Sequence, residues 1–447
     1  MGESTSSSIA HAERAPLALK VLGNTARKAK PLDDSRRRRL IQWLFDNQTS
    51  LAFYSIAFLL VIHSYVPAAR PHTSKFFKLS FHNATTGKYG AGHDDLYFVA
   101  FCVVLLIGIR AALMQHVLGP LGRHWGIRKN KDVARFSEQG WMLVYYSVIW
   151  PLGTYLYYHA PYYLDMKKLW VNWPQRELDG LMKGYFMVQW AYWVQQVISV
   201  NIEARRKDYW EMIIHHVITI SLIAACYAYH QTRVGHLILV LMDVVELIFP
   251  LAKCLKYIGF TTLCDVVFGV FLLVWVWTRH VFYLMTCWSV FHDLPRSLHQ
   301  PCFRGPAGAV EGPFSPPDWS HLLEPFKDPA GTVCMTDGIT KGFLAFLLAL
   351  EVVICVWSFF IIRVTVRVLK GASAEDVRSD VEEDGEGETA YDGAGAIEED
   401  VGVEPVDLKP WGRSAAKKES GSRVSGVRTH SGRKELLNRI GCEKHID

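Results

Sequence analysis

Two neighbouring apolar segments, residues 209–229 and 234–252, contain ionisable side chains suited to acid–base chemistry. These side chains are His215 and His216 in the first segment and Asp243 and Glu246 in the second. Ionisable groups are costly at membrane depth, so their presence inside apolar segments indicates a functional site. Imidazole next to a carboxylate is the pairing that provides a base near neutral pH, and the sequence therefore favours acid–base or nucleophilic catalysis.

The spacing of these groups predicts that they lie at one depth. The short polar link 230–233 makes the two segments antiparallel helices, and Lys207 and Lys253 mark the same membrane edge. At about 1.5 Å per residue, each group lies roughly 10 to 15 Å below that edge. The i, i+3 spacing predicts that Asp243 and Glu246 share one side of their helix. Consecutive histidines point about 100° apart, which predicts different roles for them.

The same four groups also fit three roles without acid–base catalysis. A metal site is disfavoured because adjacent histidines diverge and the histidine boxes of membrane di-iron enzymes are absent, so we expect no metal and no cofactor. A proton or ion path uses the same residue types. The third role is a structural hydrogen-bond cluster, and the sequence leaves all three open.

The rest of the chain predicts an all-α polytopic membrane protein. Half of its 447 residues are hydrophobic although both ends are polar, so the middle is far more apolar than a soluble domain. Eight segments have about the length that a helix needs to cross a bilayer. They are residues 50–68, 96–118, 140–158, 181–200, 209–229, 234–252, 260–285 and 339–362. Seven spans remain an alternative, if the first segment or 140–158 does not cross.

The distribution of Lys and Arg predicts the orientation. With eight spans, the side that holds both termini carries nineteen Lys and Arg residues in its N-terminal arm and connections, against eleven on the other side. By the positive-inside rule both termini are cytosolic. We expect four regions: a disordered basic arm (1–40), two N-terminal spans (41–134), a catalytic membrane domain (135–370) and a disordered tail (371–447).

Several residues outside the central segments are candidate modification sites. Asn83 begins an Asn-X-Thr sequon in a predicted lumenal loop, which predicts a glycan. Ser373 and Ser379 each precede an acidic residue by three positions, a pattern typical of phosphorylation sites. Three cysteines share the predicted lumenal loop, and one pair among them could be bridged, although the sequence does not say which. These are Cys287, Cys302 and Cys334.

The segment 205–253 closely resembles the signature of the ceramide synthases, the acyl-CoA-dependent sphingoid-base acyltransferases of the TLC-domain superfamily. The matching residues are Arg206-Lys207-Asp208, Glu211-Met212, His215-His216, Thr219, Arg233-Val234-Gly235, Asp243 and Ala252-Lys253. Weaker similarity extends over residues 135–365 and includes Arg279-His280. The chain departs from many members at Met242, where they have histidine, and at Glu246, where they have aspartate.

The resemblance implies a TLC-type helical barrel that encloses an intramembrane site in the endoplasmic reticulum membrane. It implies N-acylation of a long-chain sphingoid base by a fatty acyl-CoA, with one histidine as nucleophile, the other as base, and the carboxylates in support. The substrate-binding residues would be Arg205, Arg206, Lys207, Asp208, Arg279 and His280. A homo- or heterodimer and a small regulatory subunit are further partners that relatives suggest.

Two rival functions follow from the same pattern. The first is a TLC-type membrane protein that binds or senses lipid without catalysis, which has no need of a paired base and carboxylate. The second is a transporter, which is disfavoured because the sequence has no inverted repeat or pair of broken helices.

Overall fold

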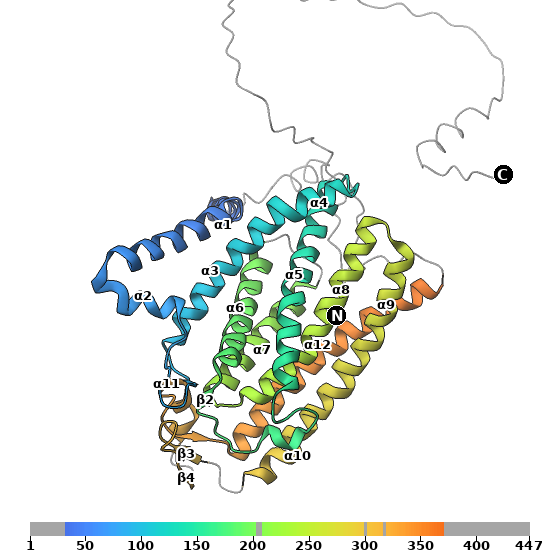
Figure 1. Cartoon of the computed structure of the whole chain (residues 1–447). Helices are drawn as coiled ribbons and strands as arrows, with labels where there is room; N and C mark the ends of the chain where they lie inside the picture. The colour runs from blue at the N-terminus through green and yellow to red at the C-terminus, as the bar shows by residue number, and fades with distance from the viewer. Residues whose placement is uncertain (1–31, 203–207, 299–301, 316–318, 371–447) are drawn as a thin grey trace, which may run out of the picture. The chain divides into compact units, whose positions relative to one another are not determined.

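The computed structural model describes residues 32–202, 208–298, 302–315 and 319–370 (Figure 1). The predicted phosphorylation sites Ser373 and Ser379 and the predicted CoA-binding residues Arg205, Arg206 and Lys207 lie outside this part of the chain. The long helices are α1 (Leu32–Tyr65), α3 (Asp95–Leu113), α5 (Asn130–Tyr158), α6 (Gly180–Ile202), α7 (Tyr209–Ala228), α8 (Thr232–Ile258), α9 (Thr261–Trp275), α10 (Tyr283–Ser297) and α12 (Asp337–Leu369).

Two of these helices continue through π-helical turns. The segment η3 (Met114–Leu118) joins α3 to α4 (Gly119–His124), and η5 (Val276–Phe282) joins α9 to α10. Such π-helical turns are often found at functional sites. The one at η5 contains Arg279 and His280, which the sequence singled out.

Helices cover all eight predicted apolar segments, and five of the described helices are long and apolar enough to cross a membrane. They are Asp95–His124, Tyr209–Ala228, Thr232–Ile258, Thr261–Ser297 and Asp337–Leu369. A sixth span results if the bent pair Asp46–Tyr65 and Pro67–Phe77 is counted as one. Helices α5 and α6 are not among them, because many Tyr, Trp and Gln side chains make them less apolar. The chain is therefore an all-helical membrane protein with five to six candidate spans in its described part.

The helices around the central segments pack in pairs. Helix α8 packs against α5 and α9, α6 against α3 and α7, and α12 against α7 and α10. Gly235 lets α8 approach its neighbours closely, because a Cβ atom there would lie 3.1 Å from the Phe186 ring and 3.2 Å from Cys226 Cβ. A larger residue at this position would push α8 away from α6 and α7.

The connection before α12 contains a small antiparallel sheet in the order β4-β3-β5, formed by β3 (Cys302–Arg304), β4 (Glu311–Phe314) and β5 (Val333–Cys334). A disulfide joins Cys302 to Cys334, which resolves the open pairing. The expectation that Cys287 lies in this loop was wrong, because α10 continues to Ser297 and keeps Cys287 buried as a free thiol.

Two buried cations, Lys183 and Arg176, bind loop residues at the end of the bundle where α7 ends and α8 begins. Lys183 Nζ lies 2.6 Å from Asp95 Oδ1, and both side chains are almost fully buried. Lys183 also donates to the carbonyls of Ser80 and Gly90. A buried ion pair with these additional hydrogen bonds costs several kcal/mol to break, so it fixes the starts of α3 and α6.

The second buried cation, Arg176, holds the loop that precedes β5. It donates to Gly331 O at 2.9 Å, and its other terminal nitrogen lies 2.9 Å from His230 Nε2. Burial lowers the pKa of Arg176 to about 10, so the guanidinium stays charged at neutral pH. Burial, together with the charge of Arg176, lowers the pKa of His230 to about 3. His230 is therefore neutral over the physiological range.

Candidate active site

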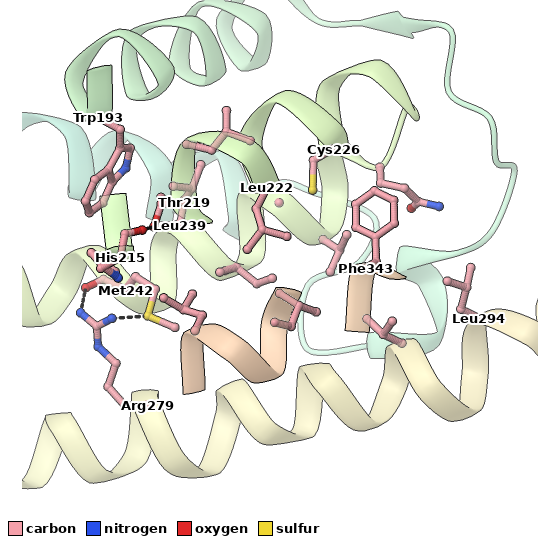
Figure 2. A pocket seen from close by; sticks show the side chains of 18 of the residues that line it. Trp193, His215, Thr219, Leu222, Cys226, Leu239, Met242, Arg279, Leu294 and Phe343 are labelled. Atoms are coloured by element: carbon pink, nitrogen blue, oxygen red, sulfur yellow. Dashed lines mark hydrogen bonds between the residues drawn. The ribbon is translucent and has the colours of Figure 1, made fainter. Parts of the chain in front are cut away.

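An elongated apolar cavity lies between α7, α8, α12 and the η5–α10 segment (Figure 2). The empty space between its lining residues, counted together with space open to solvent at the mouth, is about 820 Å³. The two ends of the cavity differ in the residues that line them. The polar end has Trp193, His215, Glu246 and Arg279, and the far end has Gln231, Leu294, Met335 and Phe343.

His215 lines the polar end of this cavity. Its ring is buried and makes no hydrogen bond with any described residue, and Nδ1 is completely enclosed. Two indole rings pack edge-on against it, Trp193 with a centroid separation of 5.3 Å and Trp357 with 5.0 Å. The imidazole is thus held by ring contacts, and its nitrogens are not engaged in hydrogen bonds within the described part of the chain.

His216 does not line the cavity and has a fixed hydrogen-bonding state. Its Nδ1 donates to the Met212 carbonyl one turn earlier in α7. A carbonyl oxygen only accepts, so Nδ1 carries the proton and Nε2 of the neutral ring keeps a free lone pair. The two ring centroids are 5.6 Å apart. The adjacent histidines thus differ in environment, as their helical spacing predicts.

The two carboxylates of α8 also differ. Glu246 lines the cavity and lies 3.2 Å from Arg279 Nη2, forming an ion pair. Asp243 is fully buried outside the lining and accepts a hydrogen bond from Gln189 through Oδ2, while Oδ1 has no partner. Within the described residues, no hydrogen bond joins either histidine to either carboxylate.

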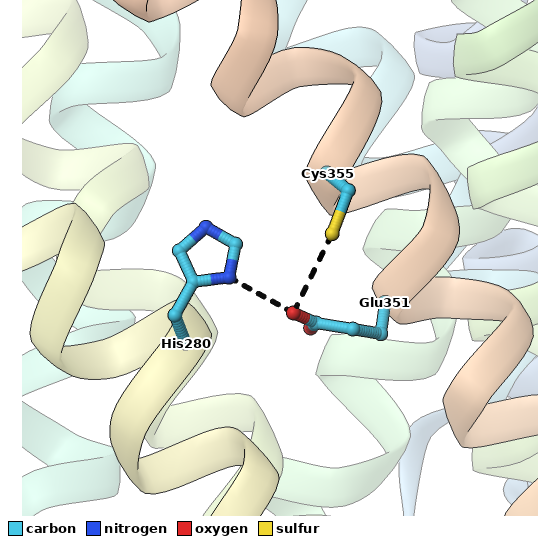
Figure 3. A group of neighbouring side chains, drawn as sticks. All are labelled: His280, Glu351 and Cys355. Carbon is cyan, nitrogen blue, oxygen red and sulfur yellow. Dashed lines mark hydrogen bonds and ion pairs between the residues drawn. The ribbon is translucent and has the colours of Figure 1, made fainter.

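Arg279 and His280 are adjacent in sequence but face different helices. Arg279 lines the cavity, where it contacts the Met242 sulfur and donates to the Met242 carbonyl at 3.0 Å. His280 faces α12, with Nδ1 2.9 Å from Glu351 Oε1 and Nε2 2.8 Å from Ser358 Oγ. Figure 3 shows His280, Glu351 and Cys355, whose potential ligand atoms all lie within 4.8 Å of one another. Both nitrogens of His280 already have hydrogen-bond partners on α12. The role of His280 that these bonds indicate is to hold η5 against α12.

A hydrogen-bonded network behind Asp243 escaped the sequence analysis. Gln189 of α6 is fully buried, and it donates to Asp243 and to the Tyr185 hydroxyl at 3.1 Å. Its Oε1 accepts from the Tyr145 hydroxyl at 3.2 Å. Gln189 lies in the middle of an apolar segment, between Met187 and Trp190, and a glutamine at such a position is a signal that could have identified it.

The remaining predicted site residues lie apart from the cavity. Asp208 is buried at the start of α7, where its carbonyl accepts from the Met212 amide. Asn83, the predicted glycan acceptor, donates through Nδ2 to Glu177 at 2.7 Å and accepts from Thr85 through Oδ1. Asn83 and Thr85 lie in the loop that precedes α3, and the contact with Glu177 joins this loop to the chain just before α6.

Comparisons with known proteins agree with this architecture. Residues 135–363 match the model of the TLC domain. The chain is 49% identical to the ceramide synthase FUM18 of Gibberella moniliformis, over 86% of this chain and 88% of that protein. It is 38% identical to the sphingosine N-acyltransferase-like protein ALT7 of Alternaria alternata, over 78% and 79%.

A third relative is the sphingosine N-acyltransferase lag1 of Schizosaccharomyces pombe, which is 32% identical over 78% of this chain and 82% of that protein. The similarity therefore covers most of each protein, including α7, α8 and the cavity between them. This chain belongs to the ceramide synthase family of TLC-domain membrane proteins.

Proposed function

We propose that this ceramide synthase acylates its sphingoid base at the polar end of the cavity, with His215 as the nucleophile. The reaction joins a fatty acyl group from acyl-CoA to the amine of the base as an amide. The observation that carries the proposal is the position of His215. It is the member of the histidine pair that lines the cavity, and its ring makes no hydrogen bond with the residues that the structure describes.

The reaction would proceed in two steps. A His215 nitrogen attacks the thioester carbonyl, a C–N bond forms, the C–S bond breaks, and the CoA thiolate leaves and takes up a proton. The amine then attacks the acyl-imidazole, the amide bond forms and the imidazole leaves. Two easier steps replace one difficult step, which is the advantage of nucleophilic catalysis.

His216 would accept the proton that the amine loses. Its Nδ1–H bond to Met212 leaves Nε2 as an acceptor in the neutral ring, the state that a general base requires. Glu246 and Arg279 would order the polar end of the cavity, because their ion pair lies on its wall. Asp243 would act from behind this wall through Gln189.

The apolar length of the cavity would hold the fatty acyl chain. Its lining extends along α7 from His215 to Cys226, eleven residues or about 16 Å of helix. The acyl carbonyl would lie at His215 and the chain end near Leu294, Met335 and Phe343. A mostly hydrocarbon wall stabilises a methylene chain by about 0.8 kcal/mol for each buried CH₂.

The membrane arrangement that fits this reaction has eight spans and a helical barrel. The packing of α8 against α5 and α10, and of α12 against α7 and α10, supports this arrangement. With the start of α7 on the cytosolic side of the endoplasmic reticulum membrane, Arg205, Arg206 and Lys207 would receive the polyanionic CoA head group. Asn83 would then be lumenal, and both termini with Ser373 and Ser379 cytosolic.

Detergent-purified protein, incubated with a long-chain base and acyl-CoA, tests the proposal through amide product measured by mass spectrometry. We expect His215→Ala and His216→Ala to lower turnover at least about 1,000-fold, the scale seen when a catalytic group is removed. Both variants should elute as folded protein in size-exclusion chromatography. Turnover within tenfold of the unmodified enzyme in folded His215→Ala protein would contradict the proposal.

A further inference from the structure

The indole ring of Trp193 lies beside the proposed nucleophile, and its N–H is a hydrogen-bond donor without a partner in the described part of the chain. Trp193 belongs to α6, is 6% exposed and lines the polar end of the cavity. Its Nε1 is completely buried and forms no hydrogen bond with any described residue. Figure 2 shows Trp193 at the same end of the cavity as His215 and Arg279.

A buried donor without a partner is unusual in a folded protein. Indole Nε1 can only donate, so the group cannot be satisfied by a change of tautomer or a flip. Native proteins contain few such atoms, and each is unfavourable for folding. A donor that is unsatisfied in the free protein but close to a reactive group is ready to bind charge that develops during a reaction.

We propose that Trp193 Nε1–H is an oxyanion donor for both acyl-transfer steps. When His215 attacks the thioester, the carbonyl π electrons move onto oxygen, and they return when the C–S bond breaks. When the amine attacks the acyl-imidazole, the same oxygen again becomes an anion until the bond to His215 breaks. In each step the N–H donates a hydrogen bond to that oxygen and transfers no proton.

The position of the ring supports this role. The Trp193 ring lies edge-on to both histidines, with centroids 5.3 Å from His215 and 5.4 Å from His216. An acyl group on His215 would therefore lie beside the indole ring. Most of the residues that line the cavity are apolar, which strengthens a hydrogen bond to an anion.

Other donors near His215 are less suited to the oxyanion. The terminal nitrogens of Arg279 already contact Met242 and Glu246, although its Nε has no partner. His216 donates its Nδ1 proton to a backbone carbonyl. Trp357 also has a buried N–H without a partner, but it does not line the cavity.

The test removes the N–H and keeps the ring. We expect Trp193→Phe to lower kcat by about 100-fold or more, the effect of losing one oxyanion donor, with the KM for acyl-CoA within about threefold. The control is Trp141→Phe on α5. Trp141 also has a buried Nε1 without a partner but lies outside the cavity lining, so its kcat should stay within about threefold.

A second variant covers the case in which Trp193→Phe does not fold. Benzothienylalanine at position 193, introduced by genetic code expansion, replaces the N–H by sulfur in a ring of the same size, and we expect the same loss of kcat. A loss below tenfold in either folded variant would overturn the proposal. The inference rests on the proposed role of His215, and the two fail separately: active His215→Ala protein rejects the nucleophile, whereas inactive His215→Ala with active Trp193 variants rejects the oxyanion donor alone.

Discussion

Arg279 and His280 are consecutive residues of η5, but they face different surroundings. The two surroundings differ in how many of their polar atoms have hydrogen-bond partners. Arg279 faces the cavity, where His215 and Trp193 have polar atoms without partners. His280 faces α12, where Glu351 and Ser358 occupy both of its nitrogens. Among the described residues, the ring of His215 thus has no hydrogen-bond partner, whereas both ring nitrogens of His280 have one, although Oε2 of Glu351 has none. We take this difference between the two imidazoles to distinguish a reaction site from a structural contact.

The largest expected effect distinguishes His215 from His280. His215→Ala should lower turnover at least about 1,000-fold while the protein still folds. His280→Ala should lower the free energy of unfolding by about 1–3 kcal/mol and leave kcat within a fewfold, because it leaves Glu351 without its partner. Amide formation and thermal unfolding in detergent measure the two effects. A kcat loss of 1,000-fold in folded His280→Ala protein would remove the distinction.

A smaller effect on kcat is expected at Gln189 and Asp243, which do not line the cavity. Gln189→Leu removes the hydrogen-bond donor of buried Asp243, and we expect about a tenfold lower kcat together with a loss of about 1–3 kcal/mol of stability. The control is Gln195→Leu, which removes one hydrogen bond to Ser199 on the same helix. Equal kcat values for the two variants would show that Asp243 takes no part in the reaction.

The far end of the cavity should influence chain length and leave the chemistry unchanged. Met335→Ala enlarges the cavity next to the Cys302–Cys334 disulfide. We expect the preference between long and short acyl-CoAs to shift severalfold toward longer chains, by about 0.8 kcal/mol for each additional CH₂ that is buried. Competition between acyl-CoAs of different length, with products resolved by mass spectrometry, gives the ratio. An unchanged ratio would mean that the acyl chain does not reach Met335.

The smallest effect concerns pH and the contact between Arg176 and His230. The pKa of His230 is about 3 in the folded protein, below the value of about 6.5 in an unfolded chain. The unfolded state therefore binds more protons between these values, so stability is complete above about pH 6.5 and decreases as the pH falls. From pH 6.5 to 5.5 the loss is about 1 kcal/mol, and His230→Gln should remove this part of the pH dependence. Identical slopes in the two proteins, measured by thermal unfolding, would contradict this assignment.

The helices could largely be predicted from sequence, as could His215, Glu246 and Arg279 of the cavity wall, because apolar length and ionisable residues are local signals. The different surroundings of the two histidines, and of the two carboxylates, could not be predicted. Spacing places Asp243 and Glu246 on one side of α8, but the packing of α6 decides that Gln189 covers Asp243 and that Glu246 reaches the cavity. Likewise, only the continuation of α10 to Ser297 separates Cys287 from the disulfide.

The central claim is that His215 carries the acyl group. The direct measurement is to incubate the purified enzyme with acyl-CoA without sphingoid base, digest it and locate the acyl group by mass spectrometry. The account predicts a fatty acyl mass on the peptide that contains His215, absent in His215→Ala and released as amide when base is added. Turnover without any acylated peptide, or an acyl group located on His216, would contradict it.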